Sequence, residues 1–279
     1  TIHGNTAGEY IMLLTFMGDK NNNPSYKTAT IKLIKENAKK LNIPIIAHES
    51  DYSFGLANKI ILKTCKTMCV NFKNLEGKNK KVKYTGPIFS KKFEDKHQNK
   101  SNLNLDDNKK TILVVGGSLG SKIINENIVK ILPELLKNFN VIHITGKGNL
   151  NIKSFNNYNA IDRTDDIVNL YNIADFVIGR SGAGVTAECY YKRLPMLLIP
   201  LGKASRGDQL QNAKYYKELR VAEILHEEDL DSVGFMETIN SFAFDLDKYK
   251  SNYKKQEKIN GKQKIIALIN DYTNKKPIN

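Results

Sequence analysis

Apolar and polar positions follow two repeating patterns along the second half of the chain. Short β-branched runs at residues 111–115 and 175–179 predict strands, and residues 123–139 carry apolar side chains at helical spacing. Pro133 predicts a kink or break in that helix. Strands that alternate with helices of this length are typical of βαβ units and a parallel sheet. Further strands are predicted at 140–145 and 195–199, and further helices at 185–192 and 208–219.

The first half is less regular. Residues 43–47 predict a buried strand that runs into His48-Glu-Ser-Asp51, and residues 53–69 predict a helix. Residues 94–110 are charged, rich in Asn and almost without apolar side chains, which is typical of a linker between domains. The domain prediction is therefore an N-terminal domain at 1–93, a linker at 94–110 and a second domain at 111–254. The segment 255–279 contains an amphipathic stretch that is expected to pack back on the first domain.

Composition sets the outer limits. The 279 residues are 41% hydrophobic, and no apolar run approaches the roughly 18 residues that a membrane span needs. Because Thr1 is not a natural start, an N-terminal anchor stays open. The three cysteines are an odd set without metal-ligand spacing, which favours buried reduced thiols and a cytoplasmic protein.

The net charge of +14 is unevenly distributed. Residues 1–104 hold 18 of the 43 basic and 8 of the 29 acidic residues, so they carry +10. Such a surface suits solvated Lys faces or an anionic membrane surface. Nucleic acid is disfavoured as a partner because residues 1–104 contain no Arg, whose forked side chain is the usual reader of bases and phosphates.

Glycine-rich turns mark the ends of two predicted strands. The first is Gly116-Gly-Ser-Leu-Gly120, and the second lies in Arg180-Ser-Gly-Ala-Gly184. Backbone N–H groups at such a turn and at the following helix N-terminus form an anion site, which commonly holds a nucleotide pyrophosphate. Glu188 follows one helical turn later, where a carboxylate can accept hydrogen bonds from ribose hydroxyls. This arrangement predicts a protein that binds a nucleotide sugar.

The same residues, in the same order, carry a family resemblance. Together with these loops it rests on the following motifs: His48-Glu49, Gly55-Leu-Ala-Asn58, Gly86-Pro87, Gly146-Lys-Gly148, Asp166 with Tyr171, Ala174-Asp175, Glu188, Pro195, Pro200, Gln209 and Asn212-Ala213. The chain resembles the MurG family of bacterial N-acetylglucosaminyltransferases. The resemblance implies an α/β protein of the GT-B class, with two Rossmann-like domains facing a cleft and the N-terminal one truncated.

The resemblance also assigns donor-binding candidates. Ser118 is expected at a donor phosphate, and backbone groups at Arg163 and Thr164 are expected to hold the uracil, although the family usually has an aromatic-aliphatic pair there. Glu188, exposed on its helix, is expected to bind the ribose. The remaining donor-binding candidates are Ser181, Gly182 and Ala183 near the pyrophosphate, Asp208 and Gln209 near the sugar hydroxyls, and Asp51.

The acceptor half departs from the family pattern. The first loop reads Gly4-Asn-Thr-Ala-Gly-Glu9, so that Glu9 replaces a histidine and becomes the candidate general base. Asp51 stands where the family has Asn, Phe89 where an Arg is common, and Val185 where Thr is usual. These departures predict that donor binding is better preserved than catalysis.

The implied reaction is an inverting transfer of N-acetylglucosamine from UDP-N-acetylglucosamine to an undecaprenyl-linked muramyl-peptide. It needs no cofactor and no tightly held metal, and it implies a peripheral position on the inner face of the bacterial cell membrane. Lys-rich segments at 59–66 and 78–83 are candidates to meet anionic headgroups. Three alternatives stay open: a GT-B enzyme with another acceptor, a sugar-nucleotide epimerase, and a catalytically degenerate UDP-sugar-binding protein.

Overall fold

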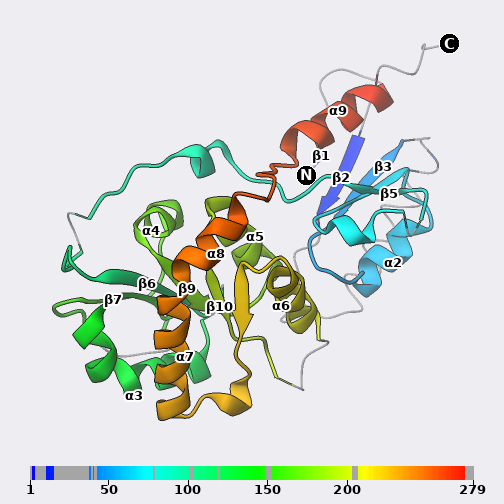
Figure 1. The fold of residues 1–279 in the computed structure, drawn as a ribbon. Coiled ribbons are helices and arrows are strands. Elements are labelled where there is room, and N and C mark those ends of the chain that lie inside the picture. The colour runs from blue at the N-terminus through cyan, green and yellow to red at the C-terminus, as the bar shows by residue number, and fades with distance from the viewer. Residues whose placement is uncertain are drawn as a thin grey trace. The chain divides into compact units, whose positions relative to one another are not determined.

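The computed structural model describes residues 2–3, 11–15, 38, 40, 43–77, 79–100, 103–117, 120–148, 153–202 and 207–273. The chain divides into two compact units (Figure 1). Unit 1 comprises Thr1–Phe89 and Ile259–Asn279, and unit 2 comprises Ser90–Lys258. In the described ranges, no helix is both long enough and apolar enough to cross a membrane.

Unit 1 is built on a five-stranded sheet of order β1-β2-β3-β4-β5. The first pair is antiparallel and the others are parallel. Every residue of β3 and β4 is buried, including the polar His48, Glu49 and Thr67. The strands are β1 (Ile2–His3), β2 (Ile11–Thr15), β3 (Ile45–Glu49), β4 (Thr67–Val70) and β5 (Val82–Tyr84).

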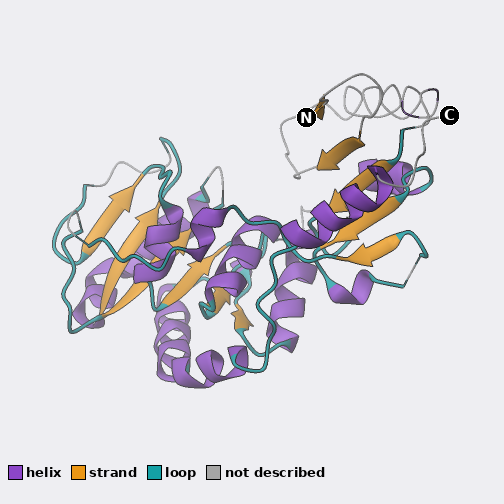
Figure 2. Ribbon diagram, turned by 90° about the horizontal axis from the view of Figure 1, so that it is seen from above, coloured by secondary structure: helices purple, strands orange, loops and turns teal. Residues whose placement is uncertain are grey.

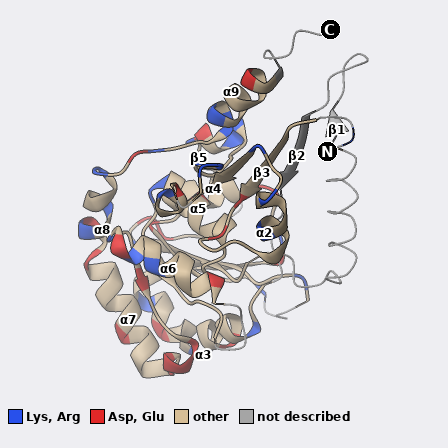
Figure 3. Cartoon of the chain, turned by 90° about the vertical axis from the view of Figure 1, so that its right-hand side faces the viewer, with Lys and Arg blue, Asp and Glu red and all other residues tan. Residues whose placement is uncertain are grey.

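The helix expected at 53–69 is wrong in its second half. Helix α2 spans only Leu56–Leu62, and the chain then turns into strand β4. Lys81 donates to the carbonyl oxygens of Leu62 (3.3 Å) and Lys63 (2.9 Å) at the end of α2. This lysine therefore caps a helix. The exposed lysines of the expected basic segments are Lys59, Lys63, Lys66, Lys80 and Lys83, which lie on and around α2 and β5 (Figure 3).

Helix α9 (Lys262–Thr273) belongs to unit 1, although it comes from the other end of the chain. Its Ile265 is 4% exposed and joins Ile46 and Cys69 in one buried apolar cluster. The hydroxyls of Tyr272 and Thr67 are 2.5 Å apart. Sequence-distant residues thus complete the core of this unit.

Unit 2 contains a wholly parallel sheet of six strands, ordered β11-β10-β9-β6-β7-β8. Numbered within the unit, this is the 3-2-1-4-5-6 order of a dinucleotide-binding fold. The strands are β6 (Lys110–Val115), β7 (Phe139–Ile144), β8 (Tyr158–Ile161), β9 (Phe176–Gly179), β10 (Met196–Leu198) and β11 (Ala222–Ile224).

Helices cover both faces of this sheet (Figures 1 and 2). Apolar residues of α3 and α7 share a buried cluster with one face of the strands, through side chains such as Ile128, Phe235 and Val114. Helices α4, α5 and α6 form contacts in series on the other side. Their bounds are α3 (Lys122–Asn138), α4 (Ile167–Ile173), α5 (Ala183–Lys192), α6 (Asp208–Glu218), α7 (Ser232–Phe244) and α8 (Leu246–Tyr253).

Helix α3 runs through Pro133 without interruption, contrary to the expected kink or break. The proline removes one backbone hydrogen bond, but the helix buries Ile128, Ile131, Leu132 and Leu135 against the sheet. We infer that this apolar face outweighs the loss of about 3 kcal/mol that an interior proline usually brings.

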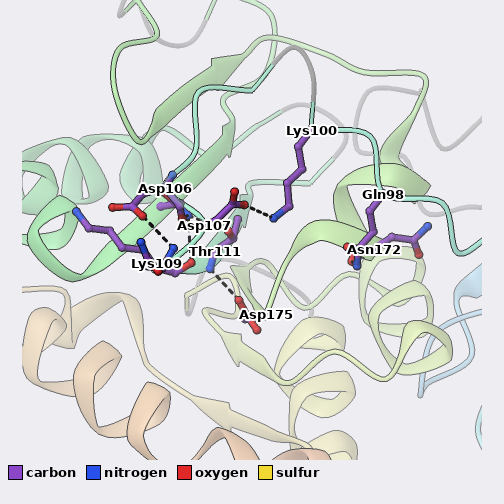
Figure 4. Close-up of polar contacts among 10 residues, drawn as sticks. Gln98, Lys100, Asp106, Asp107, Lys109, Thr111, Asn172 and Asp175 are labelled. Atoms are coloured by element: carbon purple, nitrogen blue, oxygen red, sulfur yellow. Dashed lines mark hydrogen bonds and ion pairs between the residues drawn. The ribbon is translucent and has the colours of Figure 1, made fainter.

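The segment expected as a linker, residues 94–110, follows unit 2 closely. Polar contacts to α4 fasten it, and within the segment Lys100 pairs with Asp107 at 3.0 Å (Figure 4). The Asn99 amide donates to Asn169 Oδ1 at 2.7 Å, and the Asn172 side chain donates to the carbonyl oxygen of His97 at 2.9 Å. Its polar composition thus satisfies hydrogen bonds along α4.

A chain of polar groups is buried between β7 and α3. The His143 ring lies 3.1 Å from the Tyr158 hydroxyl through Nδ1 and 2.9 Å from Asn125 Oδ1 through Nε2. Asn125 in turn donates to the carbonyl oxygen of Thr145 at 2.8 Å. Burial lowers the pKa of His143 to about 4. The imidazole is therefore neutral at physiological pH.

We expect this histidine to make unit 2 sensitive to acid. As the pH is lowered from 6.5 to 4, the unfolded chain binds a proton that folded His143 does not bind. The free energy of unfolding therefore decreases by on the order of 3 kcal/mol over this range. Urea unfolding of the full chain at a series of pH values, with hydrogen exchange of β7 amides as the readout, measures how the unfolding free energy changes with pH. The His143→Gln variant should flatten this dependence, whereas the exposed His226→Gln variant should leave it unchanged; equal slopes in all three proteins contradict the assignment.

Gly179 is expected to tolerate no side chain. A Cβ there would lie 2.3 Å from the backbone oxygen of Val115 on the neighbouring strand. Gly179→Ala should therefore cost about 3 kcal/mol of unfolding free energy in urea titrations. The control is Gly184→Ala, where a Cβ meets nothing within 4 Å on a helix, and it should gain up to about 1 kcal/mol. A Gly179→Ala protein as stable as this control would refute the close approach.

Candidate functional site

The order of the unit 2 strands places one candidate site. Strands β6 and β9 are neighbours in the sheet, but the chain leaves them in opposite directions, toward β7 and toward β10. Ligands of parallel sheets bind outside the carboxyl ends of the strands at such a reversal. The two glycine-rich turns predicted from sequence follow these two strands, so the fold brings them to the same edge.

The first turn is shaped by its glycines. A Cβ on Gly116 would lie 2.3 Å from the amide nitrogen of Ser121, and Gly117 has φ +91°, in the left-handed region. Ser118 lies outside the described residues. Ser121 precedes the first residue of α3, and its buried Oγ has no hydrogen-bond partner in the described part of the chain. A buried hydroxyl in this position is a donor that the sequence reasoning missed.

Arg180, the first residue of the second turn, connects this turn to the loop after β10. Its guanidinium donates to the carbonyl oxygens of Ile199 and Pro200, both at 3.1 Å, and pairs with Glu227. Glu227 accepts from the Gly202 amide at 2.8 Å through its other oxygen. Because the Arg180 side chain is only 7% exposed, this pair fixes the loop after β10.

Hydrogen bonds also join the second turn to the start of α6. The Ser181 hydroxyl donates to the carbonyl oxygen of Gln209 at 2.8 Å, and Asn212 donates to the carbonyl oxygen of Ser181 at 3.1 Å. The Gln209 side chain accepts from the amide of Leu201 at 3.2 Å. Ser181 and Gln209 thus lie together at the predicted site, with Oγ and Oε1 engaged in holding its loops.

The remaining donor-binding candidates of unit 2 begin a helix or stand just before one. Gly182 precedes the first residue of α5, and a Cβ on it would meet nothing within 4 Å. Ala183 begins the helix, whose ten residues direct a positive dipole toward the turn. Asp208 begins α6 after Gly207, which has φ +80°. Whether these groups bind a donor stays a prediction.

Glu188 is not the exposed helix residue that the sequence suggested. It is only partly exposed on α5, because Tyr171 of α4 packs beside it. The Tyr171 hydroxyl donates to Glu188 Oε2 at 2.8 Å. Burial raises the pKa of the Glu188 carboxyl, and the bond from Tyr171 lowers it. The sequence marked Tyr171 only as part of a family motif and gave no sign of this contact.

Arg163 and Thr164 lie in the loop after β8, three strands from β9 on the same edge of the sheet. The Thr164 hydroxyl oxygen accepts from the amide of Asp166 at 3.0 Å, and Arg163 is exposed. Thr164 and Asp166 also line a hollow, together with Asn99, Leu103, Asn169 and Leu170.

Two further candidates belong to unit 1, the general-base candidate Glu9 and the donor-binding candidate Asp51. Glu9 lies outside the described residues. Asp51 follows β3, and its amide donates to Glu49 Oε1 at 3.1 Å. Glu49 also accepts from the Gly55 amide (3.0 Å) and the Asn58 side chain (2.8 Å). His48 is buried beside it, and burial lowers its pKa. No cluster of three potential metal ligands occurs among the described residues.

Comparison with known proteins identifies the family. Residues 111–269 match the Glycosyltransferase family 28 C-terminal domain. The UDP-N-acetylglucosamine--N-acetylmuramyl-(pentapeptide) pyrophosphoryl-undecaprenol N-acetylglucosamine transferase of Clostridium botulinum strain Kyoto is 39% identical over 240 residues, which cover 83% of this chain and 68% of that protein. The chain belongs to the MurG family of family 28 glycosyltransferases. The Clostridium perfringens strain SM101 protein of the same name is 40% identical over 237 residues, or 81% of this chain. The match spans 66% of the length of that relative.

Solved structures agree on the fold. Acinetobacter baumannii MurG superimposes with a TM-score of 0.65 at 22% identity, over 85% of this chain and 69% of that one. A UDP-glucose: anthocyanidin 3-O-glucosyltransferase solved in complex with UDP gives 0.60 at 14% identity, over 82% of this chain and 68% of that one. The predicted GT-B fold class and the MurG family resemblance are therefore confirmed.

Proposed function

We propose that this MurG-family chain is an inverting glycosyltransferase that moves N-acetylglucosamine from UDP-N-acetylglucosamine to undecaprenyl-linked N-acetylmuramyl-pentapeptide. This reaction converts lipid I to lipid II in peptidoglycan synthesis. The observation that carries the proposal is the meeting of the Gly116 and Gly182 turns at the strand-order reversal, with Glu188 one helical turn beyond. The relatives at about 40% identity carry this activity in their names.

The donor is proposed to lie along the carboxyl edge of the unit 2 sheet. The uracil would meet backbone groups near Arg163 and Thr164, and the ribose would meet Glu188. The diphosphate would lie between the turns that contain Gly116 and Gly182. The ends of β8 and β9 are three strand spacings apart, about 14 Å, so an extended ligand is needed to reach both. The buried Ser121 hydroxyl supports an anion at the first turn.

In the proposed reaction, an acceptor hydroxyl attacks C1 of N-acetylglucosamine as the bond from C1 to the diphosphate oxygen breaks. The proton of that hydroxyl passes to a general base, for which Glu9 is the candidate. UDP leaves with the bonding electron pair, and its growing negative charge is stabilised by loop amides and the N-terminus of α5. The chain itself supplies this stabilisation through fixed dipoles.

The lipid acceptor implies a membrane-bound setting. We propose that the exposed lysines around α2 and β5 draw unit 1 to anionic headgroups on the cytoplasmic face, with each lysine worth up to about 1 kcal/mol. Lys81 is excluded from this set, because its ammonium group is engaged at the end of α2.

Titration calorimetry with UDP and UDP-N-acetylglucosamine, combined with a transfer assay on lipid-linked muramyl-pentapeptide, tests the proposal. Micromolar donor binding with formation of the disaccharide lipid is the expected result. The replacement of a family histidine by Glu9 favours a second candidate, a degenerate donor-binding protein. Donor binding without sugar transfer, with the same donor affinity in Glu9→Gln, would identify that candidate. Absence of any donor binding would refute both candidates.

A further inference from the structure

Tyr171 is a fully buried tyrosine whose hydroxyl meets a functional candidate. Its side chain is 2% exposed on α4, and the hydroxyl donates to Glu188 Oε2 at 2.8 Å. A buried tyrosine hydroxyl needs a hydrogen-bond partner, and here the partner is a carboxylate on the neighbouring helix α5. The contact therefore links two helices on the same face of the sheet.

Glu188 depends on this contact for its orientation. In the described part of the chain, no lysine, arginine or histidine pairs with Glu188, and Tyr171 is the one side chain that hydrogen-bonds it. A glutamate side chain has three rotatable bonds, and fixing them costs conformational entropy. A donor that fixes one carboxylate oxygen in the free protein reduces the cost of ordering the other oxygen against a ligand.

We propose that Tyr171 is a positioning residue: it holds Glu188 Oε2 so that Oε1 is presented to the ribose hydroxyls of the donor. This inference rests on the proposed function, because it takes Glu188 as the ribose ligand. Tyr171 does not touch the nucleotide. It acts through Glu188, by setting the rotamer of the side chain and by supporting its ionised form with a hydrogen bond.

The second effect gives a signature that a purely structural tyrosine lacks. The bond from Tyr171 lowers the pKa of Glu188 against the effect of burial. The other titratable group beside Glu188 is Cys189 on its own helix; burial raises the pKa of both Tyr171 and Cys189 well above their usual values, so both stay protonated from pH 5 to 8. Among these three side chains, only Glu188 can therefore change its protonation between pH 5 and 8. A pH-dependent change in donor affinity that depends on Tyr171 thus reports the protonation of Glu188.

The test is calorimetric titration of the full chain with UDP-N-acetylglucosamine from pH 5 to 8. Each phosphate of this ligand carries one ester bond and shares the anhydride bridge, so neither has a second ionisation and their charge is constant in this range. Tyr171→Phe should weaken binding at pH 7 by about five- to tenfold, or about 1–1.4 kcal/mol, because the Glu188 side chain must then be ordered when the donor binds. The pH at which affinity is half lost should move upward, because removal of the donor raises the pKa of Glu188.

Tyr158→Phe is the matched control. Tyr158 is also fully buried in unit 2, but its hydroxyl contacts His143 and not Glu188. It should leave both the affinity and the pH midpoint unchanged. In the Glu188→Gln background, Tyr171→Phe should cost less than twofold, because the carboxylate through which it acts is already gone.

The outcomes separate this inference from the function on which it rests. If the wild-type chain binds the donor and Glu188→Gln weakens binding, but Tyr171→Phe changes neither affinity nor midpoint, the positioning role is refuted and the ribose assignment stands. If the wild-type chain does not bind the donor, both fall. Should Tyr171→Phe not fold, 3-fluorotyrosine at position 171 replaces it; this stronger donor should move the midpoint downward, and an unmoved midpoint refutes the proposal.

Discussion

Glu188→Gln will weaken UDP binding by about 10- to 100-fold, the range expected when a charged acceptor of hydrogen bonds is neutralised. The substitution removes the charge and keeps an oxygen that can accept from Tyr171, so the contact between α4 and α5 survives. Glutamine is a sharper test than alanine, because alanine would also leave the buried Tyr171 hydroxyl without its partner. Titration calorimetry of UDP at pH 7 gives the dissociation constants.

Glu218→Gln is the control for charge. Glu218 is the last residue of α6 and is exposed, and its replacement by glutamine changes the net charge by the same amount. Its dissociation constant for UDP should match that of the wild type within a factor of two. If Glu188→Gln behaves like this control, then the ribose is not held by Glu188 and the proposed place of the nucleotide is wrong.

Arg180→Met will destabilise unit 2 by about 3–5 kcal/mol, because it leaves a partly buried carboxylate without its cation. The side chain of Glu227 is 23% exposed, and two carbonyl oxygens of the loop after β10 lose their donors as well. Urea unfolding of the full chain, monitored by hydrogen exchange of β9 and β10 amides, measures the loss.

An exposed ion pair of the same unit calibrates this result. Lys217 and Glu223 pair with side chains that are 52% and 33% exposed, so Lys217→Met should cost less than about 1 kcal/mol. Addition of Glu227→Gln to Arg180→Met should recover part of the lost stability, since the unpaired charge is then removed. Equal losses for Arg180→Met and Lys217→Met would mean that the guanidinium does not support the loop.

Much of unit 2 can be predicted from the order of its residues. The run of β-branched residues before Gly116 and the amphipathic stretch that follows specify β6 and α3 within a few positions. Strand β9 and helix α5 follow in the same way around Gly182. These signals are local, since strand, turn and helix are each encoded by neighbouring residues.

Prediction of elements from sequence fails where a local pattern is compatible with two structures. A buried strand of four residues, β4, has the same apolar run as a helical segment, so the pattern predicts one helix over residues 53–69. The pairing of β4 with β3 and β5, which lie far from it in sequence, decides the outcome. At Pro133 the packing of α3 on the sheet overrides the local preference for a break.

The candidate site shows the same division. Its glycine turns could be located from sequence, because the turns need glycine where a Cβ would collide, as at Gly116. The orientation of the polar side chains could not. Ser181 is turned toward Gln209, 28 residues later, and Glu188 toward Tyr171, 17 residues earlier. Contacts of this kind depend on how α4, α5 and α6 are arranged on the sheet.

The placement of α9 in unit 1 has a consequence for biosynthesis. Unit 2 is complete once Lys258 has left the ribosome, but Ile46 and Cys69 are covered only after Ile265 has emerged. Strands β3 and β4, which are synthesised before unit 2, therefore keep apolar side chains uncovered while unit 2 folds ahead of them. Nascent chains stalled before Ile265 should consequently be the ones that chaperones recognise.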